Sequence, residues 1–237
     1  MDSHFLFYVP PEQSRSDHIV FPEEEAHHMV RVLRKRAGDL VQVTDGTGNL
    51  LEVRLTHADR KSVTGEVISR VAIPPGPDRI LAMGVIKQRD RLEFAIEKAV
   101  ELGASRIVLV HSDHAEKTGI RPSRVAATIL SAMKQSRRCH LPAWEERDDF
   151  KSVLLDYGPG RQVLMAHLSS EESGLQDPSA GRSNDAPSLL LVGPEGGFSE
   201  EEIADAVTAG AGEVSLGSAR LRAETAVCAL LALLECR

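Results

Sequence analysis

The 237-residue sequence is poor in aromatic residues, in cysteine and in long apolar segments. Aromatic side chains make up 4% of the chain, and its three cysteines, Cys139, Cys228 and Cys236, have neither the spacing of metal ligands nor the even number of a disulfide framework. No apolar run is long enough to span a bilayer, and the first residues do not resemble a signal peptide. These absences predict a reduced, cytoplasmic, globular protein without a metal site.

Basic residues are outnumbered by acidic ones, 28 Lys and Arg against 35 Asp and Glu, so the formal net charge is −7. This balance argues against a protein that coats nucleic acid nonspecifically. Basic residues nevertheless gather in two clusters, one formed by Arg31, Arg34, Lys35 and Arg36 and the other by Lys117, Arg121, Arg124, Lys134, Arg137 and Arg138. Each cluster could be a solvated surface, which is the usual state of a charge run. Their concentration within an acidic chain favours RNA or another polyanion as a partner.

The chain before residue 73 is rich in predicted β-strands. Short strand candidates cover residues 5–9, 40–43, 50–55 and 62–68, and a hairpin signal lies at residues 45–49. One predicted helix, residues 22–33, has glutamates at its start and basic residues at its end, as the helix dipole favours. We expect a small β-barrel over residues 1–72, followed by a stiff, proline-rich linker at residues 73–78.

From residue 79 onward, predicted strands alternate with predicted helices. The strand candidates are residues 80–86, 106–110, 163–166, 189–192 and 213–216, and the helix candidates are residues 92–102, 123–135, 200–209 and 223–236. This alternation predicts an α/β domain over residues 79–237, with a mostly parallel sheet covered on both faces. Residues 169–188 are rich in Ser, Gly, Asp and Pro and predict a mobile surface insertion.

The most informative segment joins a predicted strand to a predicted helix through a glycine-rich turn. The apolar run Leu189–Val192 leads into Gly193-Pro194-Glu195-Gly196-Gly197, and Ser199 with Glu202 predicts a capping box at the start of the next helix. Ligand sites in open α/β sheets often occupy such a position. The turn matches neither the dinucleotide fingerprint nor the P-loop. It is therefore either a tight turn only or a ligand loop of another kind.

A second predicted strand end delivers polar groups just before an apolar helix. Arg220, Arg222, Glu224 and Thr225 fall within a few residues there. The arginines could bind phosphate or a base edge, and Thr225 could hold an adenine-like ring. The alternative is an ordinary helix start, capped by Thr225 or Ser218, with Glu224 complementing the dipole. Two glycine-containing strand ends in one α/β domain favour a single composite pocket.

Several segments together resemble the RsmE family of RNA methyltransferases. They are the Gly193–Gly197 loop, the Leu-Arg-x-Glu-Thr-Ala run at residues 221–226, the helix end at residues 97–103, Gln135–Arg138 with Pro142, and His27–Arg34 with Gly38-Asp39. The resemblance runs through both predicted domains in order. It implies a SPOUT-type knotted α/β methyltransferase domain with a C-terminal trefoil knot, preceded by a PUA-like β-barrel that binds RNA. It also implies a homodimer that uses S-adenosyl-L-methionine to methylate N3 of one uridine in 16S ribosomal RNA, free or in the small ribosomal subunit.

The resemblance also implies the residues of the site. The cofactor-binding set is Ala166, His167, Leu168, Val192, Gly193, Pro194, Glu195, Gly196, Gly197, Leu216, Gly217, Leu221, Arg222, Glu224, Thr225 and Ala226. Our hypothesis is that an arginine stabilises the developing uracil anion while a glutamate organises the site, which gives the catalytic candidates Arg222, Arg220, Arg138 and Glu224. The RNA-binding candidates are Arg31, Arg34, Lys35, Arg36, Arg137 and Arg138.

Two positions depart from the family pattern. Ala219 stands where the family commonly has arginine, and Arg220 occupies the usually apolar position beside it. His114 replaces the arginine of a common Ser-Glu-Arg segment. The leading interpretation is an RNA base methyltransferase. One alternative is a noncatalytic RNA-binding homologue that binds the cofactor without turnover, and another is a nucleotide-binding enzyme that uses the glycine loops for phosphate.

Overall fold

A computed structural model describes residues 5–115, 119–166 and 184–235. The chain divides into two compact units, which are described separately. The first comprises Met1–Pro75 and Met133–Leu141, and the second comprises Gly76–Ala132 and Pro142–Arg237. Within the described ranges, the helices are too short or too polar to cross a membrane.

The first unit is built on one five-stranded sheet. Its strands are β1 (Leu6–Tyr8), β2 (His18–Val20), β3 (Leu40–Thr44), β4 (Asn49–Ala58) and β5 (Val63–Ala72). They lie in the order β1-β3-β4-β5-β2, and all pairs are antiparallel except β1 with β3. The predicted hairpin at residues 45–49 is confirmed as the connection between β3 and β4. Sequence analysis missed β2, a three-residue strand in which only Ile19 is buried.

Two short helices precede β3. They are α1 (Pro11–Ser14) and α2 (Glu23–His27), and α2 continues into the π-helix η1 (His28–Val32). The helix predicted over residues 22–33 is therefore two helices, because the hydrogen-bond spacing lengthens from four residues to five, as in the Leu33 N–H bond to the His28 carbonyl oxygen at 3.1 Å. Met29 of η1 is fully buried with residues of β1 and β3 in the core of this unit.

The segment Met133–Leu141 belongs to the first unit although it lies far along the chain. Gly48 donates its backbone N–H to the carbonyl oxygen of Cys139 at 2.8 Å. Lys134 forms an ion pair with Glu25 of α2, whose side chain is 5% exposed. These contacts tie the segment to both the β3–β4 turn and α2.

The second unit is built on a six-stranded sheet in which every neighbouring pair is parallel. The order is β11-β9-β10-β6-β7-β8. The strands are β6 (Arg79–Gly84), β7 (Arg106–Val110), β8 (Ala143–Arg147), β9 (Gln162–Ala166), β10 (Ser188–Val192) and β11 (Gly212–Val214). The predicted parallel α/β sheet is confirmed, with β8 as an additional strand.

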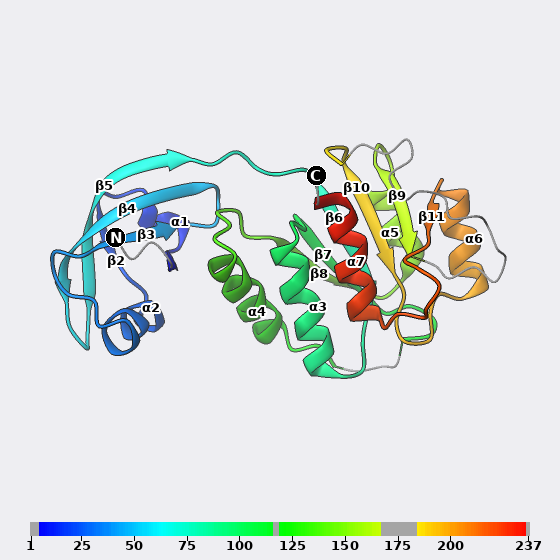
Figure 1. Ribbon diagram of the computed structural model, residues 1–237, viewed down its shortest axis with the longest axis horizontal. Helices are drawn as coiled ribbons and strands as arrows, with labels where there is room; N and C mark the ends of the chain where they lie inside the picture. The colour runs from blue at the N-terminus through cyan, green and yellow to red at the C-terminus, as the bar shows by residue number, and fades with distance from the viewer. Residues whose placement is uncertain (1–4, 116–118, 167–183, 236–237) are drawn as a thin grey trace. The chain divides into compact units, whose positions relative to one another are not determined.

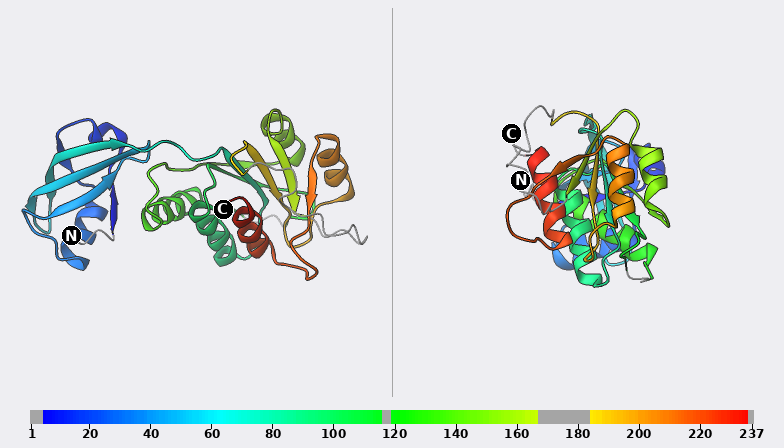
Figure 2. Two further views of the ribbon diagram at one scale, coloured as in Figure 1. Left: turned by 45° about the horizontal axis from the view of Figure 1, so that its top comes forward. Right: turned by 90° about the vertical axis from the view of Figure 1, so that its right-hand side faces the viewer.

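Helices cover both faces of this sheet (Figures 1 and 2). They are α3 (Arg89–Glu101), α4 (Pro122–Gln135), α5 (Phe150–Tyr157), α6 (Glu200–Thr208) and α7 (Ala223–Glu235). The helices α3 and α7 pack together on one face, and α5 packs with α6 on the other. The predicted insertion at residues 169–188 lies mostly outside the described residues.

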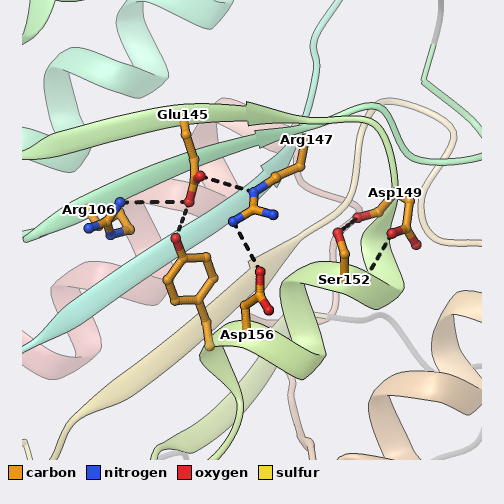
Figure 3. A network of polar contacts seen from close by, with 7 residues as sticks. Arg106, Glu145, Arg147, Asp149, Ser152 and Asp156 are labelled. Carbon is orange, nitrogen blue, oxygen red and sulfur yellow. Dashed lines mark hydrogen bonds and ion pairs between the residues drawn. The ribbon is translucent and has the colours of Figure 1, made fainter.

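Polar side chains hold β8 at the edge of the sheet (Figure 3). Glu145 accepts hydrogen bonds from Arg147 Nε at 3.0 Å and from the Tyr157 hydroxyl of α5. Arg106 Nη1 lies 3.7 Å from Glu145 Oε1, and Arg147 Nη2 lies 3.1 Å from Asp156 Oδ2. Burial alone would raise the pKa of Glu145, but the hydrogen bonds from Tyr157 and Arg147 lower it below its usual value. This network explains why β8 has a polar sequence.

Candidate functional site

A cavity of about 560 Å³ opens at one edge of the parallel sheet. Its lining includes the last residues of three strands, Ala166 of β9, Val192 of β10 and Val214 of β11. These strands are neighbours in the sheet, with β9 in the middle. Because the carboxyl ends of parallel strands share one edge, the loops that follow them meet there.

The glycine-rich loop that follows β10 forms one wall of the cavity. Gly197 has φ 77°, a conformation that side chains disfavour, and donates its backbone N–H to the Pro194 carbonyl oxygen at 2.9 Å. The predicted capping box is confirmed: Ser199 Oγ accepts from the Glu202 N–H at 3.2 Å, and Glu202 Oε2 accepts from the Ser199 N–H at 2.8 Å. The loop therefore ends at a firmly fixed helix start.

The segment after β7 supports this loop from outside the cavity. Ser199 Oγ donates to Asp113 Oδ2 at 2.7 Å, and the Asp113 N–H donates to Glu202 Oε1 at 3.1 Å. A Cβ atom built on Gly196 would lie 2.8 Å from Cβ of His114. His114, which departs from the family pattern, therefore packs directly against the glycine-rich loop.

The segment between β11 and α7 forms another wall. Gly217 has φ 118°, which turns the chain after the strand. Arg220 Nη2 donates a hydrogen bond to the carbonyl oxygen of Glu195 at 3.1 Å and so joins this segment to the glycine-rich loop. The first turn of α7 closes with the Ala226 N–H bonded to the Arg222 carbonyl oxygen at 2.8 Å. The two segments that sequence analysis singled out thus line one cavity.

Most residues of the predicted cofactor-binding set line this cavity. They are Ala166, Val192, Gly193, Pro194, Glu195, Gly196, Gly197, Leu216, Gly217, Leu221, Arg222 and Ala226. His167 and Leu168 lie outside the described residues. Sequence analysis did not assign a further group of lining residues to the cofactor, namely Phe198, Val214, Ala219 and Arg220. Their positions next to the two glycine segments were the available signal.

Glu224 and Thr225 lie on the first turn of α7 but are not among the lining residues. The Glu224 side chain is 11% exposed, and its Oε1 lies 3.5 Å from Arg91 Nε of α3. In the part of the chain that the structure describes, its Oε2 has no hydrogen-bond partner. Glu224 therefore connects α7 to α3.

The predicted RNA-binding residues all belong to the first unit. Arg31 lies in η1, and three further members, Arg34, Lys35 and Arg36, follow it closely. The remaining members are Arg137 and Arg138. Among the described residues, Arg34 (φ 54°) and Arg137 (φ 60°) are the only non-glycine residues with positive φ. Arg137 Nη2 also donates to Gln42 Oε1 of β3 at 2.6 Å. Arg138, a catalytic candidate, lies in the first unit, whereas the cavity belongs to the second.

The cavity combines apolar and backbone surface with a few exposed charges. Glu195, Arg220 and Arg222 are exposed, whereas Pro194 and Val192 are buried. Its volume falls in the range of roughly 300–1,000 Å³ that is usual for small-molecule sites. Within the described ranges, no group of three or more His, Cys, Asp or Glu side chains is arranged to hold a metal ion.

Comparison with protein families defines the class. Residues 74–235 match the RNA methyltransferase domain family, and residues 21–68 match the RNA methyltransferase PUA domain family. The fold and these matches define a two-domain RNA methyltransferase with a PUA-like first unit. More particularly, the chain belongs to the family of ribosomal RNA small subunit methyltransferase E.

Relatives along nearly the whole chain support this assignment. The chain is 30% identical to ribosomal RNA small subunit methyltransferase E of Mycobacterium bovis, over 95% of this chain and 89% of that protein. The crystal structure of a probable rRNA-methyltransferase from Porphyromonas gingivalis is 34% identical, with a TM-score of 0.85 over 96% of this chain and 95% of that one. The crystal structure of a ribosomal RNA small subunit methyltransferase E from Neisseria gonorrhoeae, bound to S-adenosyl methionine, is 25% identical. Its TM-score is 0.81 over 96% of this chain and 95% of that one.

Proposed function

We propose that this protein transfers the methyl group of S-adenosyl-L-methionine to N3 of a specific uridine in 16S ribosomal RNA. The observation that carries the proposal is that the Gly193–Gly197 loop and the Leu216–Arg222 segment line the same cavity. The cavity lies at the ends of three parallel strands in a chain of the methyltransferase E family. The related Neisseria enzyme binds S-adenosyl methionine, which supports the same cofactor here.

The shape and chemistry of the cavity fit this cofactor. Gly197 and Gly217, both at positive φ, let the backbone close around a ligand where a side chain would be strained. Apolar side chains such as Val192 and Leu216 suit a base and a methylene chain. We assign cofactor binding to the lining residues, with the backbone of the Leu221–Ala226 segment beside the adenine ring.

For this reaction the protein has to align the two reactants and supply positive charge, and it does not need a covalent intermediate. The sulfonium of the bound cofactor supplies an already activated methyl group, so the protein mainly has to align the reactants and exclude water. Uridine N3 carries a proton at neutral pH; this proton has to pass to solvent before N3 can accept the methyl group, and nearby positive charge favours the anion that results. Arg222 and Arg220 line the cavity and are the first candidates to stabilise that anion. Arg138 is a further candidate, and Glu224 would organise the site through Arg91.

The first unit is proposed to bind the RNA backbone. Arg31, Arg34, Lys35, Arg36, Arg137 and Arg138 supply the positive charge that phosphates require. The positive φ of Arg34 and Arg137 supports this role, because backbone strain concentrates at functional sites. Replacing Arg31 and Arg34 by glutamine should weaken RNA binding and flatten its salt dependence without changing cofactor affinity.

A homodimer is proposed for the working enzyme. Phe94 of α3 and Leu233 of α7 are 44% and 41% exposed, although these helices pack together. Exposed apolar side chains on packed helices suit burial against a second copy. Light scattering of the purified protein tests this, and a monomer at all concentrations would contradict it. The trefoil knot remains a prediction of the family resemblance.

The decisive experiment is a methyl-transfer assay with S-adenosyl-L-methionine. Free 16S ribosomal RNA and small ribosomal subunits should be offered separately, and the modified base should then be mapped. Methylation at uracil N3 supports the proposal. Cofactor binding in a calorimeter without methyl transfer would instead favour a noncatalytic RNA-binding homologue, and absence of cofactor binding would favour a nucleotide-binding enzyme.

The Arg222→Ala variant separates chemistry from binding. If Arg222 stabilises the uracil anion, kcat should fall by about 100-fold or more, while the Kd for the cofactor changes only a few-fold. Unchanged turnover with weakened cofactor binding would remove Arg222 from the chemistry and leave it as a binding residue.

A further inference from the structure

A second cavity in the methyltransferase unit has a strongly basic lining. It measures about 270 Å³ and lies where α3 and α4 begin. Its charged lining residues are Lys87, Arg89, Arg121, Arg124 and Glu93. The cavity shares no lining residue with the cavity at the carboxyl ends of β9, β10 and β11. It is therefore a separate site.

The floor of this basic cavity is apolar and belongs to the core. Leu92 and Ile96 of α3 and Val125 of α4 line it, and all three are buried. The cationic side chains at its mouth, including Arg89 and Arg121, are exposed. Charges beside a low-dielectric floor act on a ligand more strongly than charges surrounded by water.

Among the lining residues that the structure describes, Glu93 is the only carboxylate, and it is already paired with an arginine. Glu93 accepts hydrogen bonds from Arg124 Nε at 2.7 Å and from Arg124 Nη2 at 3.0 Å. This hydrogen-bonded guanidinium holds the pKa of the Glu93 carboxyl below its usual value. In the described part of the chain, the Arg121 side chain has no hydrogen bond or ion pair. The lining therefore carries an excess of positive charge.

The position of this charge is unfavourable for the isolated protein. Helix starts carry partial positive charge, so basic residues there reduce helix stability. Arg121 directly precedes α4, whose first turn has no acidic residue, whereas α3 begins with Arg89 followed by the acidic Asp90. Where local stability and sequence disagree in this way, function is the usual reason. An anionic ligand would make both the side-chain charges and the helix ends favourable.

The size of the cavity limits the ligand. At about 270 Å³ it lies below the range of roughly 300–1,000 Å³ that drug-sized ligands and cofactors occupy. We infer that this cavity binds a backbone phosphate of the RNA substrate, through Arg89 and Arg121 with Lys87 and Arg124 beside them. The inference rests on the proposed function, because it takes RNA as the substrate. It gives the methyltransferase unit an RNA contact of its own, in addition to the basic residues of the first unit.

The test compares three variants that each remove one positive charge from the same unit. Arg89→Gln and Arg121→Gln change the cavity, whereas Lys151→Gln on α5 removes an exposed charge that lies elsewhere and pairs with Asp205 at 3.3 Å. Binding of 16S ribosomal RNA is measured at several salt concentrations. Each cavity variant should raise Kd about 3- to 10-fold and reduce the slope of log K against log salt by about one. Lys151→Gln should stay within about twofold of wild type, and all three should bind S-adenosyl-L-methionine normally.

The methyl-transfer assay on wild-type protein keeps this inference distinct from the proposed function. If wild type methylates RNA and both cavity variants bind RNA like Lys151→Gln, the inference is wrong and the proposed function stands. If wild type transfers no methyl group but the cavity variants still lose RNA affinity and slope, the inference holds and the proposed function fails. If wild type does not bind RNA at all, both fail.

Discussion

Gly84, the last residue of β6, lies directly against Pro194 of the glycine-rich loop. A Cβ atom built on Gly84 would lie 2.5 Å from the backbone nitrogen of Pro194 and 3.0 Å from its Cβ. Atoms cannot approach so closely, so any side chain at residue 84 has to displace the loop. A central strand of the sheet thereby fixes the position of one wall of the proposed cofactor cavity.

Replacing Gly84 by alanine should therefore damage both stability and cofactor binding. We expect the free energy of unfolding to fall by about 1–3 kcal/mol, as for other overpacked cores, and the Kd for S-adenosyl-L-methionine to rise. Gly76→Ala is the matched control, because a Cβ atom there meets nothing within 4 Å. Denaturant unfolding and calorimetric titration measure the two effects. Equal cofactor affinity in both variants would show that the loop position does not govern binding.

Arg220 is a candidate to stabilise the uracil anion, but its bond to the Glu195 carbonyl oxygen predicts a second role, in which it supports cofactor binding through the glycine-rich loop. Arg220→Met removes the hydrogen bond to the Glu195 carbonyl oxygen, which is worth about 0.5–1.5 kcal/mol. The Kd for the cofactor should then rise about 2- to 10-fold with little change in stability. Lys151→Met serves as an exposed control. A lower kcat with unchanged Kd would instead place Arg220 at the reacting base.

The Arg91–Glu224 pair should stabilise the packing of α3 against α7. Arg91→Met leaves the largely buried Glu224 carboxylate without its positive partner, and we expect a loss of about 1–3 kcal/mol in the free energy of unfolding. The double variant Arg91→Met/Glu224→Gln should recover part of that loss, because the buried charge is gone. Denaturant unfolding of wild type, Arg91→Met, Glu224→Gln and the double variant gives a coupling energy, and strictly additive effects would contradict an interaction between the two residues.

Much of the second unit could be predicted because its elements follow strong local rules. The apolar run of β10 and the Ser199–Glu202 capping box are both visible in the sequence, and both are present. By contrast, β8 was missed because Glu145 and Arg147 make it polar, and only the ion-pair network of the folded chain explains this. The start of α5 did carry a signal, since Asp149 caps it through the N–H groups of Lys151 and Ser152.

The candidate site was predictable as two segments and less so as one cavity. The order β11-β9-β10 brings residues 166, 192 and 214 to neighbouring strand ends, and local sequence patterns do not determine such an order. The same limit applies to Met133–Leu141, whose membership of the first unit depends on hydrogen bonds to residues almost a hundred positions away. In both cases, the arrangement depends on contacts between residues that are distant in the sequence, and the periodicity of the sequence does not reveal such contacts.

Acid should reveal the role of Asp45 in the β3–β4 turn. Burial alone would raise the pKa of Asp45, but hydrogen bonds from the Thr47 N–H, Asn49, Ser14 and the Thr47 hydroxyl outweigh it and lower the pKa from 3.8 to about 2. A carboxyl whose pKa is lower in the folded than in the unfolded protein stabilises the fold at pH values above its pKa in the unfolded protein. This stabilisation is lost as the pH falls through its pKa in the folded protein. The contribution of Asp45 is therefore present above pH 3.8 and disappears toward pH 2.

Asp45→Asn isolates this contribution from those of other carboxyls. The variant should be about 1–3 kcal/mol less stable than wild type at neutral pH. The difference between the two proteins should shrink between about pH 4 and pH 2, which urea unfolding at several pH values measures. A difference that stays constant over this range would show that Asp45 does not titrate with unfolding.

Arg34 offers a way to separate folding from RNA binding at one residue. Its φ of 54° reverses the chain after η1, where the Lys35 N–H bonds to the Met29 carbonyl oxygen at 2.9 Å. Arg34→Gly relieves about 1 kcal/mol of backbone strain, partly offset by the greater freedom of glycine in the unfolded chain. Stability should therefore stay unchanged or rise slightly, whereas Arg34→Ala keeps the strain.

Both Arg34 variants lose the positive charge and should bind 16S ribosomal RNA several-fold more weakly, with the salt slope reduced by about one. Thermal unfolding and RNA titration on the same samples check the two expectations. If Arg34→Gly folds as predicted and binds RNA like wild type, the strained arginine serves the turn alone. If its RNA affinity falls while its stability holds, the strain at residue 34 is kept for the sake of the charge that it presents to the RNA.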